Sequence, residues 1–492
     1  MSHQPHSRPT TANCWVQHVA SQTGKSLNNA ILFDGRTAQC KMKIVIIGGG
    51  IAGIAAAFCL GKAGHYITVV ETAPAITEVG AGIRVGPNMS RLLMRWGLGE
   101  HLKQLGVKPL SVSFRRYSTG GRMGFSVFGD TMEFEHGAPY YHLHRADLIG
   151  MLSEIAGPFM TLRLGSRVLS VDPEGVSVTL ESGEILHGDI ILGADGVKSV
   201  TRSGILGSMD YPLPTGDSVY RAIIPTSEMM KDPLLRPLVD VPEVSCWMGP
   251  GKHIVGYCIR AKREYNLVLL CPEGSKSKSP DSWTAIGSPD EMRSVFKGWE
   301  PRVENLLKLV RTTMTGTLVV RKPLTTWLDS KKRIALIGDA CTPSLTLFDS
   351  ILTLGNTLQP YRTQGSAMAI EDAAVLGNIL SRISYKDQIP VFLEAYEKIR
   401  IGRTTSTQAA SWSNQRIFHL PDGAEQQARD NSMRAAMFEL FSGGNNEHQG
   451  NANVWADKEK NFEQFSYDAD EAVNQWWRTE GAISLHRQFA KM

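Results

Sequence analysis

Three glycines and one acidic residue near the start of the chain have the spacing of a phosphate-binding turn. Residues 48–53 read Gly-Gly-Gly-Ile-Ala-Gly, so Gly48, Gly50 and Gly53 occupy the glycine positions of a GxGxxG motif. The first glycine allows a tight turn, the second lets a pyrophosphate approach the backbone, and the third permits close packing of a helix on a strand. Glu71 follows 18 residues after Gly53. A carboxylate there can accept hydrogen bonds from both hydroxyls of an adenosine ribose, so the spacing predicts dinucleotide binding.

The residues around this turn predict the elements that would position it. The apolar run Lys43–Ile47 predicts a buried parallel strand, the small residues after Gly50 predict a helix, and Tyr66–Glu71 predicts the next strand. At the start of such a helix, unpaired amides and the positive end of the dipole stabilise phosphates. A GxGxxG motif alone is a weak signal, and a merely glycine-rich turn is the alternative. The strand, the helix and the acid in register favour the dinucleotide site.

Two later segments place an acidic residue after a strand that ends in glycine. Asp195 lies in Gly-Ala-Asp-Gly-Val-Lys-Ser-Val-Thr-Arg (193–202), and Asp339 lies in Lys-Arg-Ile-Ala-Leu-Ile-Gly-Asp-Ala (332–340). With the glycine turn, these segments resemble the signatures of group A FAD-dependent aromatic monooxygenases, and most of all fungal salicylate hydroxylase-type enzymes. The resemblance extends from Met42 to about Trp477 and includes Tyr-Tyr-His-Leu-His-Arg-Ala-Asp-Leu (140–148), His-Leu-Pro-Asp-Gly (419–423) and Trp-Ala-Asp (455–457).

The resemblance implies FAD as the cofactor. Asp195, with Gly196, would serve both FAD and NAD(P)H, and Asp339 would bind the ribityl hydroxyls. A helix that starts at Gly365 and Ser366 would direct its positive end at the pyrimidine end of the flavin. The alternative for Asp195 is a cap on the helical turn that follows it.

Two further residues match cofactor contacts of the family. Gly82 lies in the glycine loop after the second strand, where the backbone passes close to the cofactor. Arg145 would also contact FAD, and a surface ion pair is the alternative for its side chain.

The resemblance also implies the reaction. NAD(P)H binds transiently and reduces FAD, and the reduced flavin reacts with O2 to give a C4a-hydroperoxide that transfers one oxygen atom to an electron-rich ring. The expected substrate is a phenolic acid or a polyketide-derived phenol, and a carboxylate ortho to the phenol can be lost during hydroxylation. The implied context is secondary-metabolite biosynthesis or aromatic catabolism. The alternative on the same scaffold is an FAD oxidoreductase or epoxidase that acts on a non-aromatic substrate.

Two residues match positions that face the substrate in related hydroxylases. Arg221 is expected to bind the substrate anion, and Tyr257 is expected to orient the substrate hydroxyl or to deprotonate it. For Tyr257 the alternative is a sheet tyrosine that packs on its neighbours.

The fold class that follows is α/β, and α+β overall. A Rossmann-like FAD-binding domain is expected over 42–215 and 322–400, interrupted by an antiparallel-sheet substrate domain over 216–321, with a helical C-terminal region over 401–492. Apolar runs at Val244–Met248, His253–Arg260 and Tyr265–Leu270 predict strands of the substrate sheet. Another strand is predicted at Ile185–Leu192, and a long helix at Gly365–Leu380.

Composition excludes several other functions. The chain has 492 residues and a net charge of +4, without a basic block, so nucleic-acid binding is not expected. The apolar stretch Ile44–Gly61 contains five glycines and belongs to the βαβ unit, so no membrane span is expected. Metal-ligand spacing is absent from the sequence. Its seven scattered cysteines favour a reducing compartment, and a cytoplasmic location is expected. The sequence does not predict the oligomeric state.

Two segments depart from the family pattern. Residues 1–41 are expected to form a disordered N-terminal extension; the alternatives are a transit peptide and a wrongly assigned start codon, with Met42 as the true first residue. Residues 346–359 interrupt the pattern between the second Gly-Asp pair and the following Gln-Gly, and they form an insertion of 14 residues. The insertion is either a loop that reshapes the pocket or an unspliced intron. A flavin-binding protein inactivated by the insertion is therefore a further alternative.

Overall fold

The computed structural model describes residues 31–76, 81–273, 285–321, 324–341, 364–442 and 457–483, and it describes residues 320 and 408–415 by their backbone alone. The described part of the N-terminal extension is folded. Leu32, Phe33 and Ala38 are buried in the main hydrophobic core, and the amides of Gln39 and Cys40 donate to the carbonyl of Ile383. The disorder expected for 1–41 is therefore wrong for residues 31–41, because their apolar side chains cover the helices of the first domain. Residues 1–30 lie outside the described part.

A five-stranded parallel sheet forms the centre of the first domain, in the order β18-β11-β1-β2-β7. Its strands are β1 (Lys43–Ile47), β2 (Tyr66–Val70), β7 (Met160–Arg163), β11 (Ile190–Gly193) and β18 (Ile334–Leu336). The two strands predicted around the glycine turn are thus confirmed. The single strand predicted at Ile185–Leu192 is wrong, because the chain breaks at Gly188 and Asp189 into β10 (Ile185–His187) and β11.

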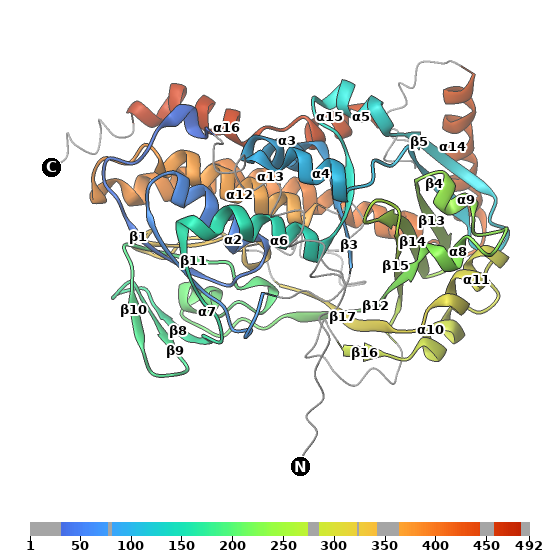
Figure 1. Cartoon of the computed structure of the whole chain (residues 1–492), viewed down its shortest axis with the longest axis horizontal. Helices are drawn as coiled ribbons and strands as arrows, with labels where there is room; N and C mark the ends of the chain where they lie inside the picture. Colours follow the sequence, from blue (N-terminus) through green and yellow to red (C-terminus); the bar gives the residue numbers. More distant parts are fainter. Residues whose placement is uncertain are drawn as a thin grey trace, which may run out of the picture.

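Both faces of this sheet are covered, as the continuous apolar character of its strands requires. Ile44 and Ile46 of β1 face a helical layer, whereas Val45 and Ile47 face a small antiparallel sheet of β8 (Val168–Asp172), β9 (Ser177–Leu180) and β10. Figure 1 shows the helical layer stacked above β1 and β11, with the small sheet below. The first domain contains the helices α2 (Ile51–Lys62), α3 (Pro87–Leu93), α4 (Gly99–Leu105), α6 (Arg145–Ala156), α7 (Val200–Leu206) and α12 (Gly365–Leu380).

A second sheet of eight strands has the order β16-β17-β12-β15-β14-β13-β4-β5. Its strands are β4 (Ser111–Arg116), β5 (Arg122–Val127), β12 (Leu213–Pro225), β13 (Glu243–Gly249), β14 (Lys252–Ile259), β15 (Glu264–Pro272), β16 (Ala285–Gly287) and β17 (Thr313–Val320). One face packs against α8 (Thr226–Met229), α9 (Pro237–Asp240), α10 (Pro289–Val295) and α11 (Pro301–Leu309), as Figure 1 shows.

This sheet extends beyond the segment 216–321 that the sequence predicts for it. Strand β4 pairs in parallel with β13, and β5 pairs with β4, so residues 111–127 belong to the sheet rather than to the first domain. Strand β12 also begins before residue 216, at Leu213. The additional strands satisfy the edge of β13, whose backbone groups would otherwise lack sheet partners.

The C-terminal part is helical, as the sequence predicts. It contains α13 (Ile389–Phe418), α14 (Ala424–Phe441), α15 (Lys458–Phe465) and α16 (Ala469–Trp476), and α13 begins before the predicted boundary at 401. A short helix, α5 (Gly129–His136), and a two-stranded ribbon of β3 (Gly82–Val85) and β6 (Tyr141–His144) lie between the two domains in the chain. Across the described residues, every helix lacks the length or the apolar character that a membrane span needs.

One buried histidine ties the start of β1 to the end of α12. His65 Nδ1 accepts from the amide of Met42 at 3.2 Å, so Nε2 carries the proton that it donates to Leu380 O, also at 3.2 Å. Burial lowers the pKa of His65 from 6.5 to about 4. Protonation of Nδ1 would turn an acceptor into a donor facing another donor, so the folded state keeps this ring neutral.

Acid should therefore destabilise the protein through His65. The unfolded chain takes up a proton at His65 below its ordinary pKa of 6.5, whereas the folded chain does so only near 4. Stability is then lost as the pH falls through this window, by up to about 1.4 kcal/mol for each pH unit. Urea denaturation at about pH 7 and about pH 5 should show a smaller loss for His65→Gln than for the parent protein. His187→Gln, at an exposed site, is the control. An unchanged loss in His65→Gln would contradict the assignment.

Candidate functional site

The glycine turn after β1 contains two close backbone approaches and one open position. Gly48 has a φ of +104°, and a Cβ there would lie 2.4 Å from the carbonyl oxygen of Ala194. A Cβ at Gly53 would lie 1.9 Å from the carbonyl oxygen of Gly48. A Cβ at Gly50, in contrast, would meet no described atom within 4 Å. Two of the predicted glycines are thus required for packing, and the third borders open space where a ligand can approach the backbone.

A cavity of about 250 Å³ lies beside this turn. Its wall includes Gly48, Gly50, Glu71, Ser166 and Asp195, so four of the predicted cofactor residues meet at one site. Glu71 Oε2 accepts from the amide of Gly49 at 2.6 Å, and Oε1 accepts from the amide of Ala73 at 2.8 Å. A carboxylate oxygen has two acceptor positions. The held carboxylate therefore keeps acceptor capacity for ribose hydroxyls.

Asp195 makes the capping contacts that the sequence offered as the alternative to cofactor binding, and its second oxygen leaves the cofactor role a prediction. Its Oδ2 accepts from the amides of Val200 and Thr201, at 2.8 and 3.1 Å, and so caps the start of α7. Its Oδ1 is buried and accepts no hydrogen bond from the residues that the structure describes. The residue also borders the cavity, so one oxygen holds the helix while the other keeps acceptor capacity beside the predicted cofactor site.

A second group of predicted residues meets where α12 begins. Asp339 lies in the turn after β18, and its Oδ1 is 3.7 Å from the position of a Cβ at Gly365. Gly365 and Ser366 are the first residues of α12, so the positive end of a 16-residue helix lies beside the carboxylate. Burial raises the pKa of Asp339, and the charge of Arg145 opposes this rise. The structure thus brings Asp339, Arg145 and the start of α12 together.

Arg145 connects this group to the predicted substrate residues. It begins α6, and its amide donates to Ala81 O at 2.9 Å, next to Gly82. Burial and the charge of Arg145 lower the pKa of Arg221 to about 10, so Arg221 remains a cation near neutral pH. The charge of Arg145 thus reaches Arg221, and the two positive charges together favour an anion near Arg221.

Tyr257 is more enclosed than a catalytic base should be. Its side chain is 3% exposed, and its ring lies 4.4 Å from the ring of His142 between centroids. A Cβ at Gly82 would lie 2.8 Å from Tyr257 Cε2, which shows how closely the glycine loop packs on the ring. Burial raises the pKa of Tyr257. The neutral phenol favours the orienting role of the two predicted roles and does not favour deprotonation of a substrate.

The register of the second sheet places these residues on one face. Arg221 of β12 pairs with Val268 of β15, and Tyr257 of β14 pairs with Asn266, two residues away on the same strand. Because paired residues and residues two apart share a face of a sheet, Arg221 and Tyr257 project from the same side. The opposite face is covered by α8 to α11.

Sequence reasoning missed one residue that shapes this face. Asn266 is fully buried, and its Oδ1 accepts from the amide of Gly82 at 2.7 Å, which fixes the glycine loop on the sheet. The available signal is a polar residue inside the apolar strand 265–270. Buried amides are normally hydrogen-bonded, so such a residue points to a partner from another element.

Comparison with known proteins places this geometry in a family. Residues 41–411 match the family described as FAD binding domain. The chain belongs to this family. The predicted FAD cofactor and the resemblance to flavin-dependent hydroxylases are confirmed, and the protein is an FAD-dependent monooxygenase.

Individual relatives agree over most of the chain. It is 36% identical over 397 residues to FAD-dependent monooxygenase OpS4 of Beauveria bassiana (strain ARSEF 2860), covering 80% of this chain and 89% of that protein. It is 32% identical over 398 residues to 3-amino-4-hydroxybenzoate 2-monooxygenase PtmB3 of Streptomyces platensis, covering 80% and 93%. A salicylate hydroxylase substrate complex shares the fold, with a TM-score of 0.65, 23% identity and coverage of 88% of this chain and 97% of that one.

The residues present fit FAD. The open backbone at Gly50, the carboxylate of Glu71 and the buried oxygen of Asp195 suit the adenosine and pyrophosphate end, and Asp339 with the start of α12 suits the flavin end. The insertion predicted at 346–359 lies outside the described residues. Among the residues that are described, no group of three or more His, Cys, Asp or Glu side chains is arranged to hold a metal ion.

Two glycine substitutions should separate packing from ligand binding. Gly53→Ala introduces a methyl group 1.9 Å from Gly48 O. It should lower the free energy of unfolding by about 1–3 kcal/mol. Gly50→Ala meets no described atom within 4 Å, so it should leave that free energy unchanged while raising the Kd for FAD. Urea denaturation of the deflavinated protein and titration with FAD would measure both effects. Parent-like stability of Gly53→Ala, or a parent-like Kd of Gly50→Ala, would contradict the respective assignment.

Proposed function

We propose that the enzyme hydroxylates an aromatic substrate that carries an anionic group, such as a phenolic acid, with NAD(P)H and O2 as co-substrates. One oxygen atom enters the ring, the other leaves as water, and NAD(P)H supplies two electrons. The chemistry supplied by bound FAD is the transfer of these electrons to O2. The relative PtmB3 is named for the oxidation of an aminohydroxybenzoate, a substrate of this class.

The observation that carries the proposal is the position of Arg221. It is a half-buried cation on the face of the second sheet that lacks the α8–α11 layer, and the charge of Arg145 reaches it from the first domain. A substrate carboxylate or phenolate bound there would form a charge-assisted hydrogen bond with Arg221. This contact would place the ring between the sheet and the cofactor.

The remaining residues orient the ring and exclude water. Three half-buried apolar residues share the face of Arg221, and they form a surface on which an aromatic ring can pack: Ile223, Val255 and Val268. Tyr257, as a neutral phenol, donates a hydrogen bond to the substrate hydroxyl. The apolar wall keeps competing water from the reacting carbon.

Removal of the Arg221 charge should affect anionic substrates selectively. For a hydroxybenzoate, Arg221→Gln should raise the KM about 10- to 100-fold, since a hydrogen bond to a charged group contributes about 1.5–3 kcal/mol. The KM for a neutral phenol should change little. Substrate-stimulated NADPH oxidation, with product analysis to confirm hydroxylation, measures both values.

A matched control is available on the same sheet. Arg260 directly follows β14 and is paired with Asp147 at 2.8 Å, so Arg260→Gln should leave the ratio of the two KM values unchanged. Equal effects of Arg221→Gln on anionic and neutral substrates would contradict the anion-binding role.

A further inference from the structure

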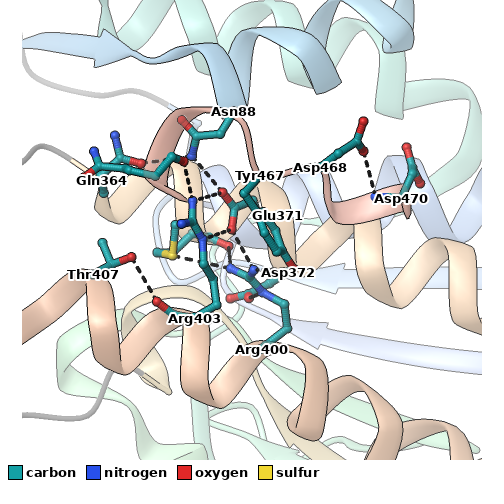
Figure 2. A network of polar contacts seen from close by, with 12 residues as sticks. Asn88, Gln364, Glu371, Asp372, Arg400, Arg403, Thr407, Tyr467, Asp468 and Asp470 are labelled. Carbon is teal, nitrogen blue, oxygen red and sulfur yellow. Dashed lines mark hydrogen bonds and ion pairs between the residues drawn. The ribbon is translucent and has the colours of Figure 1, made fainter. Parts of the chain in front are cut away.

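A cluster of buried charges joins α12 to α13. Arg400 of α13 contacts Glu371 and Asp372 of α12, with Nη1 2.6 Å from Glu371 Oε2 and Nε 2.7 Å from Asp372 Oδ1, and the three side chains are at most 1% exposed. Arg403, one turn further along α13, contacts Glu371 Oε1 at 3.1 Å. Figure 2 shows both arginines reaching from α13 toward the adjacent carboxylates.

One carboxylate of the cluster reaches the turn that carries Asp339. Asp372 Oδ2 accepts from the amide of Gly338 at 2.9 Å, while its Oδ1 holds Arg400. Gly338 has a φ of +60°, and a Cβ there would lie 2.8 Å from Ala52 Cβ at the start of α2. The turn is thus held on one side by α2 and on the other by Asp372.

The other carboxylate reaches the start of α12. Asn88 Nδ2 donates to Glu371 Oε1 at 2.7 Å and to Gln364 Oε1 at 3.0 Å. Figure 2 shows Asn88 between these two side chains. Gln364 directly precedes Gly365, the first residue of α12. Both turns assigned to the flavin end of the site are therefore connected to the same buried charges.

Stability alone does not account for such a cluster. A buried ion pair costs desolvation energy, and well-packed apolar residues of similar volume often give a fold that is as stable. The charges instead fix the orientation of the groups that they join, because charge-assisted hydrogen bonds are short and geometrically specific. Asp372 uses one oxygen for Arg400 and the other for the amide of Gly338. Glu371 contacts an arginine with each oxygen, and its Oε1 also accepts from Asn88, which in turn holds Gln364.

We propose that Arg400 is a positioning residue for FAD, which acts through Asp372 and Glu371 to fix the turns 338–340 and 364–366. It does not touch the cofactor. The inference rests on the proposed placement of the flavin between Asp339 and the start of α12.

Two substitutions test the connection from Arg400 through Asp372 to the Gly338 turn. Arg400→Lys keeps the charge, but a single ammonium cannot reproduce the fork to both carboxylates. Asp372→Asn replaces one of the two carboxylate oxygens by an NH2 group, which would face either Arg400 or the amide of Gly338 as donor against donor. Each should raise the Kd for FAD about tenfold, the equivalent of about 1.4 kcal/mol. Each should also alter the visible circular dichroism of the bound flavin, because the turns beside the chromophore shift.

A third substitution tests the connection from Glu371 through Asn88 to Gln364, and it leaves the ion pairs of the cluster in place. Asn88→Ala removes the hydrogen bonds to Glu371 and Gln364 only. It should raise the Kd for FAD by a smaller factor than Asp372→Asn. If Asp372→Asn fails to fold, the Kd of Asn88→Ala for FAD still tests the positioning role.

The control for a purely structural role is Arg115→Lys. Arg115 forms a comparably enclosed pair with Glu243 in the second sheet, at 2.7 Å and with 10% and 7% of the side chains exposed. It should lower the Tm of the deflavinated protein without changing the Kd for FAD. The control for the flavin placement is Asp339→Asn, which should itself weaken FAD binding.

Titration of the deflavinated proteins with FAD, followed by flavin fluorescence, separates the outcomes. The inference is overturned if Arg400→Lys and Asn88→Ala bind FAD as the parent does while Asp339→Asn binds it weakly. If Asp339→Asn also binds normally, the placement of the flavin is wrong and the inference fails with it. Weak binding by Arg400→Lys, with normal binding by Arg115→Lys, supports the positioning role.

Discussion

The arrangement of the site depends on how closely the start of α2 approaches the strands of the first sheet. Gly53 lies so near the carbonyl of Gly48 that a single methyl group would overlap it, and Gly338 lies almost as near Ala52. The glycine turn and the turn of Asp339 are therefore both seated on the same first turn of one helix. Because the backbone is uncovered there, amide groups and the helix dipole are available to phosphates, and both halves of the cofactor site share one rigid support.

Much of the first domain could be predicted because its signals are local. The strands β1 and β2 are continuous apolar runs, and α12 is a long run of small and apolar residues, so each could be identified within its own window. The break between β10 and β11 was missed because Gly188 and Asp189 interrupt an otherwise apolar segment. Strands β4 and β5 were assigned to the wrong domain because pairing between β4 and β13 joins residues more than a hundred positions apart, and no local pattern records it.

In the candidate site, too, residues with a local signal could be predicted, whereas contacts between distant segments could not. Gly48, Gly50 and Glu71 could be predicted from spacing and Asp195 from the family resemblance, and the cavity is lined by all four. The hydrogen bonds of Asp195 could not be predicted without the position of α7. The enclosure of Tyr257 could not be predicted without the packing of the Gly82 loop on the sheet. Glu371 and Asp372 carried a usable signal, since two adjacent acids inside an apolar helix need partners. Those partners lie on α13 and in the Gly338 turn, and only the folded structure identifies them.

The strand order of the second sheet has a mechanical consequence. The chain crosses between the two sheets at 105–111, at 127–141, at 206–213 and again at 320–334, because β4 and β5 belong to a different segment from β12 to β17. A body attached at several separate points has no single hinge about which it can swing, in contrast to hinge-closing enzymes whose domains are joined at a few residues. We therefore expect substrate admission and product release to depend on local rearrangements around the cofactor rather than on a hinge between the two sheets.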